Sequence, residues 1–376
     1  MNAEAKRLLD AILAEPDRDE PRLVYADWLL ASGDRLGELI VAQIEYARDP
    51  DNPELGRRAD ALISALRAEV IGDLPLSEPV FRRGFIEAAQ LDARAFVELG
   101  VRLFDRLPLL TGLVVWFEGL SANREVCKSP VIRRLRELGL RYADGVDVDA
   151  LSLNPGLKQL RRLELTGCEL GPPGCLSLSS IPPLASLHTL EIGSDQVGAA
   201  GMKSLSLGNF ADNLRSLRLW KAQLGPGALR YVRRFPKLEA LDLGFNDLDA
   251  GTLEPLSALS KTLRSLGLRG NRLDTQAIGA LAPLTLTDLD LDGARLGDPG
   301  VSALAELDLS KLETLDLSGN ALTLAGVRAV LELPMPKLRR LVLRRNEFMP
   351  SAKPFARKLM QTRVELDAMV LLPGRA

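Results

Sequence analysis

"LEALDLGFNDL", residues 238–248, is one of eight similar segments that follow one another from Leu160 onward. Each segment fits the pattern L-x-x-L-x-L-x-x-N-x-L, and consecutive segments begin 23 to 27 residues apart. The ninth position holds asparagine at Asn246, Asn271, Asn320 and Asn346. Two weaker segments begin upstream at positions 110 and 135. Matches this regular predict about ten copies of one structural unit, eight of them clear.

The pattern also predicts what each unit looks like. Leucines that alternate with other residues predict a short strand whose leucines point inward and whose intervening side chains face out. The asparagine side chain can bond backbone groups where the chain turns after the strand. Helical patterns follow over 275–284, 298–307 and 324–333, and the second of these opens with Asp298 as N-cap and Pro299 in the first turn. Each unit is therefore strand, turn and helix, and packs only on its neighbours.

Residues 110–349 resemble the leucine-rich repeat family through these segments, and the full helix in each unit resembles the ribonuclease-inhibitor-like subtype. The resemblance implies an α/β solenoid, with a parallel sheet on its concave side and helices on its convex side. An open solenoid needs its ends covered. We expect an N-terminal capping repeat over 79–109, with a strand at 82–91 and a helix at 92–107. Residues 350–376 should form the C-terminal cap, with a last helix and a short strand within 353–369.

Residues 1–78 lack the repeat and predict a small domain of four helices. The segment "EPDRDEPRLVYADWLLASGDRLGELIVAQ", 15–43, is similar to the repeat-companion domain that precedes leucine-rich repeats in some bacterial proteins. That resemblance implies bacterial origin and no chemistry. Within this segment Asp27 lies between apolar positions of a helix, so we expect it to be partly buried and paired. Tyr25 and Trp28 should pack against neighbouring helices or the first strands.

Composition excludes several classes of function. The formal net charge is −2 and acids balance bases, so no basic excess predicts a nucleic-acid partner. No uncharged apolar run approaches the ~20 residues of a membrane span, and no signal peptide precedes the first helix. Three scattered cysteines fit a reducing compartment. We therefore expect a cytoplasmic protein without a membrane partner, and its oligomeric state stays open.

Motifs for catalysis or cofactor binding are also missing. His188 is the one histidine and has no cysteine or carboxylate partner at the spacing of a metal site. Neither a phosphate-binding glycine loop nor a serine placed for a catalytic triad is found. The sequence therefore predicts no catalytic residue, no metal, no cofactor and no enzymatic activity.

The outward-facing strand positions carry the candidate binding residues. Two features stand out: an acidic zone in the later repeats, and tryptophans and arginines on a face where the fold does not require them, as is typical of binding hot spots. The predicted concave-face site comprises Trp116, Arg218, Trp220, Asp242, Arg269, Asp288, Asp290, Asp292, Asp316 and Arg344. A single aspartate at such a position is more often a solubilising residue, but three in one repeat favour function.

These residues predict a non-enzymatic module that binds a protein partner through the concave face. A basic partner surface would complement the aspartates. Two alternatives stay open. One is regulation of an enzyme, as an inhibitor of a nuclease or an activator of a GTPase, with Arg269, Arg340 and Arg344 as candidate arginines. The other is a structural or assembly role in which the helical domain associates with itself.

Overall fold

The computed structural model describes residues 3–118, 122–143 and 148–347, and the backbone of a strand at 365–366. The chain divides into two compact units. The first unit comprises Met1–Ala143 and Leu153–Leu160, and the second comprises Asp144–Ser152 and Arg161–Ala376. Each unit is described below by itself.

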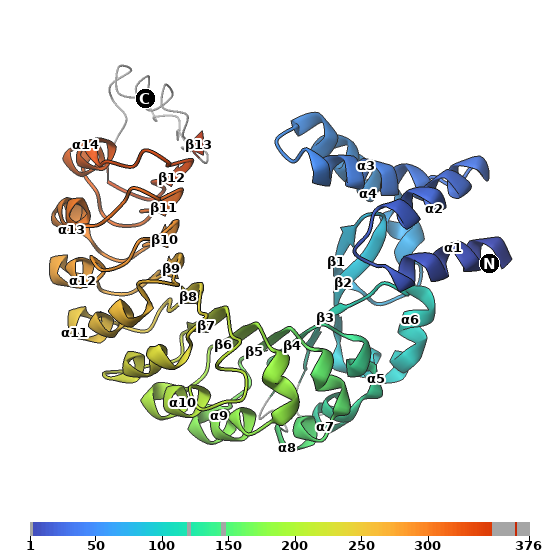
Figure 1. The fold of residues 1–376 in the computed structure, drawn as a ribbon, viewed down its shortest axis with the longest axis horizontal. Helices are drawn as coiled ribbons and strands as arrows, with labels where there is room; N and C mark the ends of the chain where they lie inside the picture. Colours follow the sequence, from blue (N-terminus) through green and yellow to red (C-terminus); the bar gives the residue numbers. More distant parts are fainter. Residues whose placement is uncertain (1–2, 119–121, 144–147, 348–364, 367–376) are drawn as a thin grey trace. The chain divides into compact units, whose positions relative to one another are not determined.

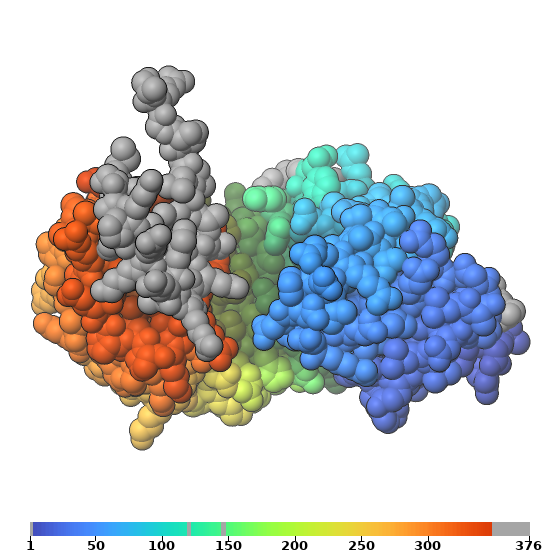
Figure 2. Space-filling view, turned by 90° about the horizontal axis from the view of Figure 1, so that it is seen from above, coloured from blue at the N-terminus to red at the C-terminus, as the bar shows by residue number. Residues whose placement is uncertain are grey.

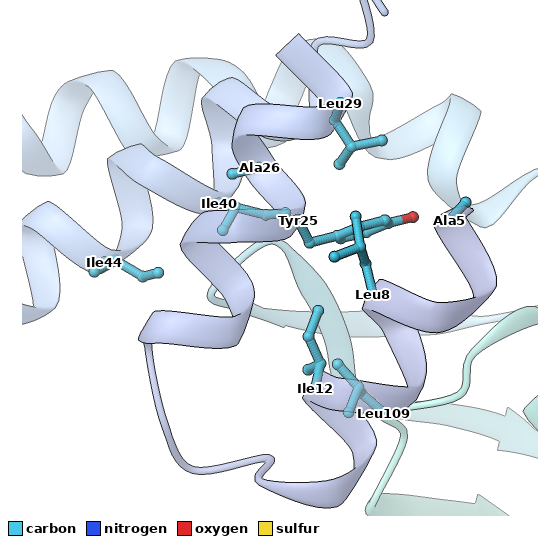
Figure 3. Close-up of a cluster of buried hydrophobic side chains, with 9 residues drawn as sticks. All are labelled: Ala5, Leu8, Ile12, Tyr25, Ala26, Leu29, Ile40, Ile44 and Leu109. Atoms are coloured by element: carbon cyan, nitrogen blue, oxygen red, sulfur yellow. The ribbon is translucent and has the colours of Figure 1, made fainter. Parts of the chain in front are cut away.

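Four helices open the first unit, as the sequence predicts: α1 (Ala3–Ala14), α2 (Glu20–Ala31), α3 (Leu36–Arg48) and α4 (Pro53–Ile71). Asn52 begins α4 by accepting the Glu54 N–H, as expected of an N-cap. The four helices appear in dark to medium blue in Figure 2. The apolar faces of α1, α2 and α3 meet in a cluster that Figure 3 shows around Tyr25, with Leu109 from beyond the helices among its members.

The aromatic residues of α2 lie where the sequence predicts, but Asp27 does not. Tyr25 is buried and stacks on Trp28 and on Phe85, with ring centroids 5.9 and 6.1 Å apart. Burial, with the nearby Asp34 carboxylate, raises the pKa of Tyr25. Asp27 is exposed, so the predicted buried carboxylate is wrong. The buried face of α2 passes through Arg22, Tyr25, Ala26 and Leu29, and Asp27 falls outside it.

The buried charge of α2 belongs to Arg22, which is 1% exposed. Its guanidinium donates to a Glu87 carboxylate oxygen at 2.8 Å and to the Pro16 carbonyl at 2.8 Å. It also lies 5.3 Å from the centroid of the Phe85 ring. Burial lowers the pKa of Arg22, while Glu87 opposes that shift. Arg22 therefore ties the helices to the strand that carries Glu87.

The N-terminal cap is a hairpin rather than the single predicted strand at 82–91. Strand β1 (Ser77–Arg82) pairs antiparallel with β2 (Phe85–Asp92). Gly84 turns the chain between them with φ +85°, and a Cβ there would lie 2.1 Å from Ile40 on α3. The predicted helix at 92–107 begins correctly with Asp92 as N-cap but breaks at Gly100, which leaves α5 (Ala93–Leu99), η1 (Gly100–Arg102) and α6 (Leu103–Arg106).

The first unit ends with the two weaker repeats. Strands β2, β3 (Gly112–Trp116) and β4 (Glu137–Arg141) pair in parallel. Equivalent positions of neighbouring repeats lie opposite each other, as Leu113 and Leu138 do. The connections contain α7 (Asn123–Lys128), η2 (Pro130–Arg134) and η3 (Pro155–Gln159). Both weaker segments are therefore repeats of the same unit.

The second unit is a regular array in which each strand pairs in parallel with its neighbours. The strands are β5 (Arg162–Thr166), β6 (Thr189–Gly193), β7 (Ser216–Trp220), β8 (Ala240–Asp242), β9 (Ser265–Gly267), β10 (Asp288–Asp290), β11 (Thr314–Asp316) and β12 (Arg340–Val342). A short β13 (Glu365–Leu366) pairs with β12.

Helical turns cover the other side of these strands. They are α8 (Val148–Ser152), α9 (Gly171–Ser179), η4 (Pro182–Ser186), α10 (Gly198–Leu205), η5 (Ala228–Arg234), α11 (Ala250–Leu253), η6 (Glu254–Leu259), α12 (Thr275–Gly279), α13 (Gly297–Ala303), η7 (Leu304–Glu306) and α14 (Leu324–Glu332). Figure 1 shows β5 to β12 along the inner side of this unit and α9 to α14 along its outer side. The strand leucines are buried between the two layers, as the alternation predicts.

The repeated asparagines stabilise the turns after the strands. Asn271 is fully buried, and its amide donates to the carbonyls of Leu243 and Leu268 at 3.0 and 2.8 Å. Its side-chain oxygen accepts the N–H groups of Asn246 and Leu248 in the preceding repeat. Each asparagine therefore links its own turn to the repeat before it, which explains why the pattern requires this residue.

The observed fold class is the predicted one, an α/β repeat solenoid with an all-helical N-terminal segment. The predicted helix of the C-terminal cap lies outside the described residues. The short strand predicted within 353–369 is described at 365–366. The predicted domain boundaries at 78, 109 and 349 stay predictions.

Candidate functional site

The inner face of the second unit contains a hollow of about 240 Å³. Its lining includes small residues of neighbouring strands, Ala240, Ser265, Gly267 and Thr314, so the backbone there is thinly covered. The Asp242 carboxylate lies against Gly267, and a Cβ added to Gly267 would be 3.0 Å from it. Arg218 and Arg340 also line the hollow. The sheet therefore offers an open, polar depression rather than a closed cavity.

Four of the five predicted acidic-zone residues line this hollow: Asp242, Asp288, Asp290 and Asp316. They are not free charges. The Asp290 carboxylate accepts the N–H of Asp292 at 2.9 Å. The carboxylates of Asp242 and Asp316 likewise accept the backbone N–H of the residue two positions later. Burial is the main cause of a raised pKa at Asp290, and neighbouring Asp316 and Asp292 add to it. The aspartates thus shape the strand ends and also give the hollow its negative charge.

Asp292 does not contribute a free charge to this zone, contrary to the sequence-based prediction. Its side chain is 10% exposed and is held by two arginines. Arg345 donates to both carboxylate oxygens at 2.7 and 2.8 Å. Arg269, from the repeat before that of Asp292, lies 3.1 Å from one of these oxygens. The charge of Asp292 is therefore neutralised where the strands end.

A second carboxylate organises the predicted tryptophan–arginine pair. Glu191, whose side chain is 13% exposed, accepts the indole N–H of Trp220 at 3.3 Å. Arg162 and Arg218 lie 3.4 and 3.6 Å from its other oxygen. The Trp220 ring covers Gly193, where a Cβ would lie 2.2 Å from the indole. Trp220 and Arg218 are thus brought together as predicted, with Glu191 between them.

A row of aromatic and charged side chains follows the C-terminal ends of the strands. Lys221 Nζ lies 5.7 Å from the centroids of both Trp220 and Phe245, and the Arg269 guanidinium lies 5.6 Å from Phe245 on the way to Asp292. We call this row the strand-end ladder; it consists of Trp220, Lys221, Phe245, Arg269, Asp292 and Arg345. It spans the repeats from β7 to β12.

The remaining predicted site residues lie apart from these contacts. Trp116 belongs to the first unit, half-buried at the end of β3, where its register partners are Asp92 and Arg141. Arg344 is exposed in the second unit, just after β12. Neither residue is a member of the strand-end ladder.

The three cysteines and the histidine are not part of the hollow or of the strand-end ladder. Cys127, Cys168 and Cys175 are buried and not disulfide-bonded, and burial raises the pKa of Cys175 to about 12. Partial burial lowers the pKa of His188, and the neighbouring cations Arg161, Arg215 and Lys237 contribute to that shift. Among the described residues no group of three histidine, cysteine or carboxylate side chains is placed to hold a metal ion.

Sequence reasoning missed the residues that connect this site: Glu191, Lys221, Phe245 and Arg345. Phe245 and Arg345 fall just outside the strand positions considered, in the residue before the asparagine position. A signal was present there. Four of the eight repeats have glycine at this position, whereas three others have lysine, phenylalanine and arginine.

Comparison with known proteins identifies the repeats. A family model described as Leucine Rich repeat matches residues 158–179, 283–305 and 308–331. The chain carries leucine-rich repeats. An internalin, inlF from Listeria monocytogenes strain 4b F2365, is similar in solved structure, with a TM-score of 0.44 and 18% sequence identity over 81% of this chain and 93% of that chain. No curated protein matches the chain.

Within residues 3–118, 122–143 and 148–347, none of the helices combines the length and the apolar composition needed to cross a bilayer.

Proposed function

We propose that this chain is a non-enzymatic interaction module that binds a protein partner through the concave face of the second unit. Leucine-rich repeat proteins generally mediate protein–protein interaction, which makes binding the starting hypothesis. A fold alone does not define a function, so the proposal depends on the residues of this face.

One observation carries the proposal: the hollow over β7 to β12 is open, and charged side chains line it at positions the core does not need. The buried leucines of these strands supply the packing, as Leu241, Leu266 and Leu289 illustrate. The outward positions hold Asp242, Asp290 and Asp316 instead. Such a surface can bury area against a partner without changes to the solenoid itself.

The negative charge of the hollow favours a partner that inserts a basic side chain there. Lysine or arginine would meet several carboxylates at once, and its positive charge would oppose the raised pKa that burial and neighbouring carboxylates give Asp290. Binding of this kind weakens as salt increases, because partly exposed charges are screened.

Regulation of a nuclease or a GTPase is less well supported. The candidate Arg269 is already held by Asp292 and Phe245, which does not favour an arginine that reaches into another protein's active site. For self-association through the helical segment, the support is a few exposed apolar side chains on α1 to α3, namely Leu13, Val24, Leu30 and Tyr46. Bacterial origin, the ribonuclease-inhibitor-like subtype and the repeat-companion domain belong to the proposal because of the sequence resemblances. A cytoplasmic location belongs to it because the three cysteines are few and scattered.

The test is quantitative capture of a partner from a bacterial lysate, with two matched double variants. Trp220→Ala with Asp290→Lys alters the concave face. Leu207→Ala with Glu306→Lys makes a large-to-small change and the same charge reversal at exposed positions away from it. We expect the first variant to lose at least ~90% of the captured partner and the second to keep it. Equal capture by both folded variants would reject the concave face as the binding surface.

A further inference from the structure

Three members of the strand-end ladder, Lys221, Phe245 and Arg345, occupy a backbone position that favours glycine. The residue before the asparagine position has positive φ in all eight repeats of the second unit: Gly167, Ser194, Lys221, Phe245, Gly270, Gly293, Gly319 and Arg345, with values from 49° to 66°. A left-handed conformation costs a residue with a Cβ about 1 kcal/mol or more, and costs glycine little. Glycine fills half of these positions, so the large side chains in three others are not required by the turn.

Those large side chains are not explained by burial either. Phe245 is 43% exposed, Lys221 is exposed and the Arg345 side chain is 65% exposed. An aromatic ring left in water at a position where glycine would suffice stabilises the monomer little. Exposed aromatic and arginine side chains are the types that dominate binding energy at interfaces.

The ladder is held in place before any partner arrives. The Phe245 ring lies over Gly270, where a Cβ would be 2.3 Å from the ring, and Lys221 and Arg269 are both placed near that ring. Trp220 lies over Gly193 and is fixed by Glu191. Because these side chains are already ordered, a partner would lose less entropy on binding them.

The ladder has three cations, Lys221, Arg269 and Arg345, and one carboxylate, Asp292, which pairs with both arginines. Beside the ladder, Arg162 and Arg218 both lie near Glu191. Positive charge is therefore in excess along the ladder. Lys221 forms no ion pair with any residue that the structure describes, and its Nζ lies between two rings. The carboxylate of Asp247, two residues after Phe245, lies 3.7 Å from Arg272.

We propose that the strand-end ladder binds an acidic segment of the partner, with an aromatic or aliphatic side chain placed on Trp220 and Phe245 and carboxylates on Lys221 and the arginines. This inference rests on the proposed function and gives the partner's chemistry. A single-stranded nucleic acid could also combine negative charge with stacking. The adjoining hollow favours a protein segment, because a peptide can place a basic side chain at Asp242, Asp290 and Asp316 beside its acidic ones, whereas a nucleic-acid backbone is negative throughout.

The probe is a fluorescently labelled ten-residue peptide with a central phenylalanine flanked by glutamates, titrated with the full chain and followed by anisotropy. A peptide with lysines in place of the glutamates and a ten-nucleotide oligo(dT) serve as comparisons. We expect the glutamate peptide to bind at least ~tenfold more tightly than the others, and its affinity to fall as salt increases. Equal binding of the lysine peptide, or tighter binding of oligo(dT), would overturn the inference.

Variants then locate the binding. Lys221→Glu and Phe245→Ala should each weaken the glutamate peptide by about tenfold, whereas Lys311→Glu, the same charge reversal at another exposed lysine of this unit, should leave it unchanged. Lys221→Gly suits the left-handed turn, so it keeps the fold if Lys221→Glu does not. An equal effect of Lys221→Gly and Lys311→Glu would overturn the assignment.

Failure of this inference is distinguishable from failure of the proposed function. If the peptide does not bind but lysate capture still depends on Trp220 and Asp290, only the acidic-segment inference is wrong. If capture ignores those residues, the concave-face proposal is wrong whatever the peptide does.

Discussion

Arg22 in the first unit and Glu191 in the second are both charged side chains that lie beside oppositely charged ones, but their partners differ in exposure. Arg22 is 1% exposed, and its partner Glu87 is 15% exposed. Glu191 is 13% exposed, but its partners Arg162 and Arg218 are 37% and 47% exposed. The first arrangement is closed and joins two elements of one unit. The second is open, with its cations still available to another molecule.

This contrast separates stability from binding. A buried ion pair is costly to form but very costly to break, because the remaining charge cannot be solvated. Exposed pairs contribute little to folding. We therefore expect substitutions in the first arrangement to act on unfolding, and substitutions at exposed residues of the second to act on partner binding.

The largest effect is expected from Arg22→Ala. The change removes the partner of Glu87 and the donor to the Pro16 carbonyl, and should lower the free energy of unfolding by about 4 kcal/mol. Chemical denaturation followed by circular dichroism measures it. Asp27→Ala on the same helix is the matched control, with a change within ~0.5 kcal/mol because Asp27 is exposed. A larger loss for Asp27→Ala than for Arg22→Ala would contradict the assignment of Arg22 as the residue that joins helices and hairpin.

Asn271→Ala should follow, at about 3 kcal/mol. Asn271 is fully buried and bonds backbone groups in two repeats, so alanine leaves several buried carbonyl and N–H groups without partners. The comparison is Asn213→Ala, which removes an exposed amide that donates to the Ala185 carbonyl and accepts from the Lys237 ammonium, both at sites open to water. If both changes shift the thermal midpoint equally, the asparagine turns do not hold the repeats together.

Gly193→Ala should have a smaller effect of about 1 kcal/mol, because the new methyl group would collide with the Trp220 ring. The displaced indole should also lose its bond to Glu191 and change its fluorescence. Gly279→Ala is the control: it has no atom within 4 Å of its added methyl group and lies in α12, so it should be slightly stabilising. Effects of the same sign would mean that Trp220 is not packed on Gly193.

The smallest effect is expected at Asp290. Since its pKa is raised in the folded state, folding favours its protonated form, so its ionisation destabilises the protein above that pKa. The penalty should vanish as the pH falls below the carboxylate's unfolded pKa. Asp290→Asn keeps an oxygen for the Asp292 N–H and should raise the thermal midpoint slightly at pH 7 but not in acid. A midpoint difference that grows with acidity would have the wrong sign.

Local patterns in the sequence predicted the repeats and the first four helices well. The alternating leucines and the asparagine position specify each strand and turn, and Pro21, Gly33 and Pro53 mark the helix ends. The pattern also placed Asp242, Asp290 and Asp316 on the inner face. These features depend on neighbours a few residues away, which a single sequence contains.

Contacts between distant segments were not predictable in the same way. Nothing near Arg22 indicates that Glu87 would be its partner, and an arginine on a helix is normally exposed. The assignment therefore fell on Asp27, five residues later on the same helix. Likewise Asp292 appeared to be free acid because Arg345, 53 positions later, crosses a whole repeat to reach it.

Hydrogen–deuterium exchange of the full chain, alone and with its captured partner, tests the central claim most directly. The account predicts slower exchange in strands β7 to β12 and in the turns that carry Lys221 and Phe245, with no change in helices α10 to α14. Protection confined to those helices, with the strands unaffected, would contradict it.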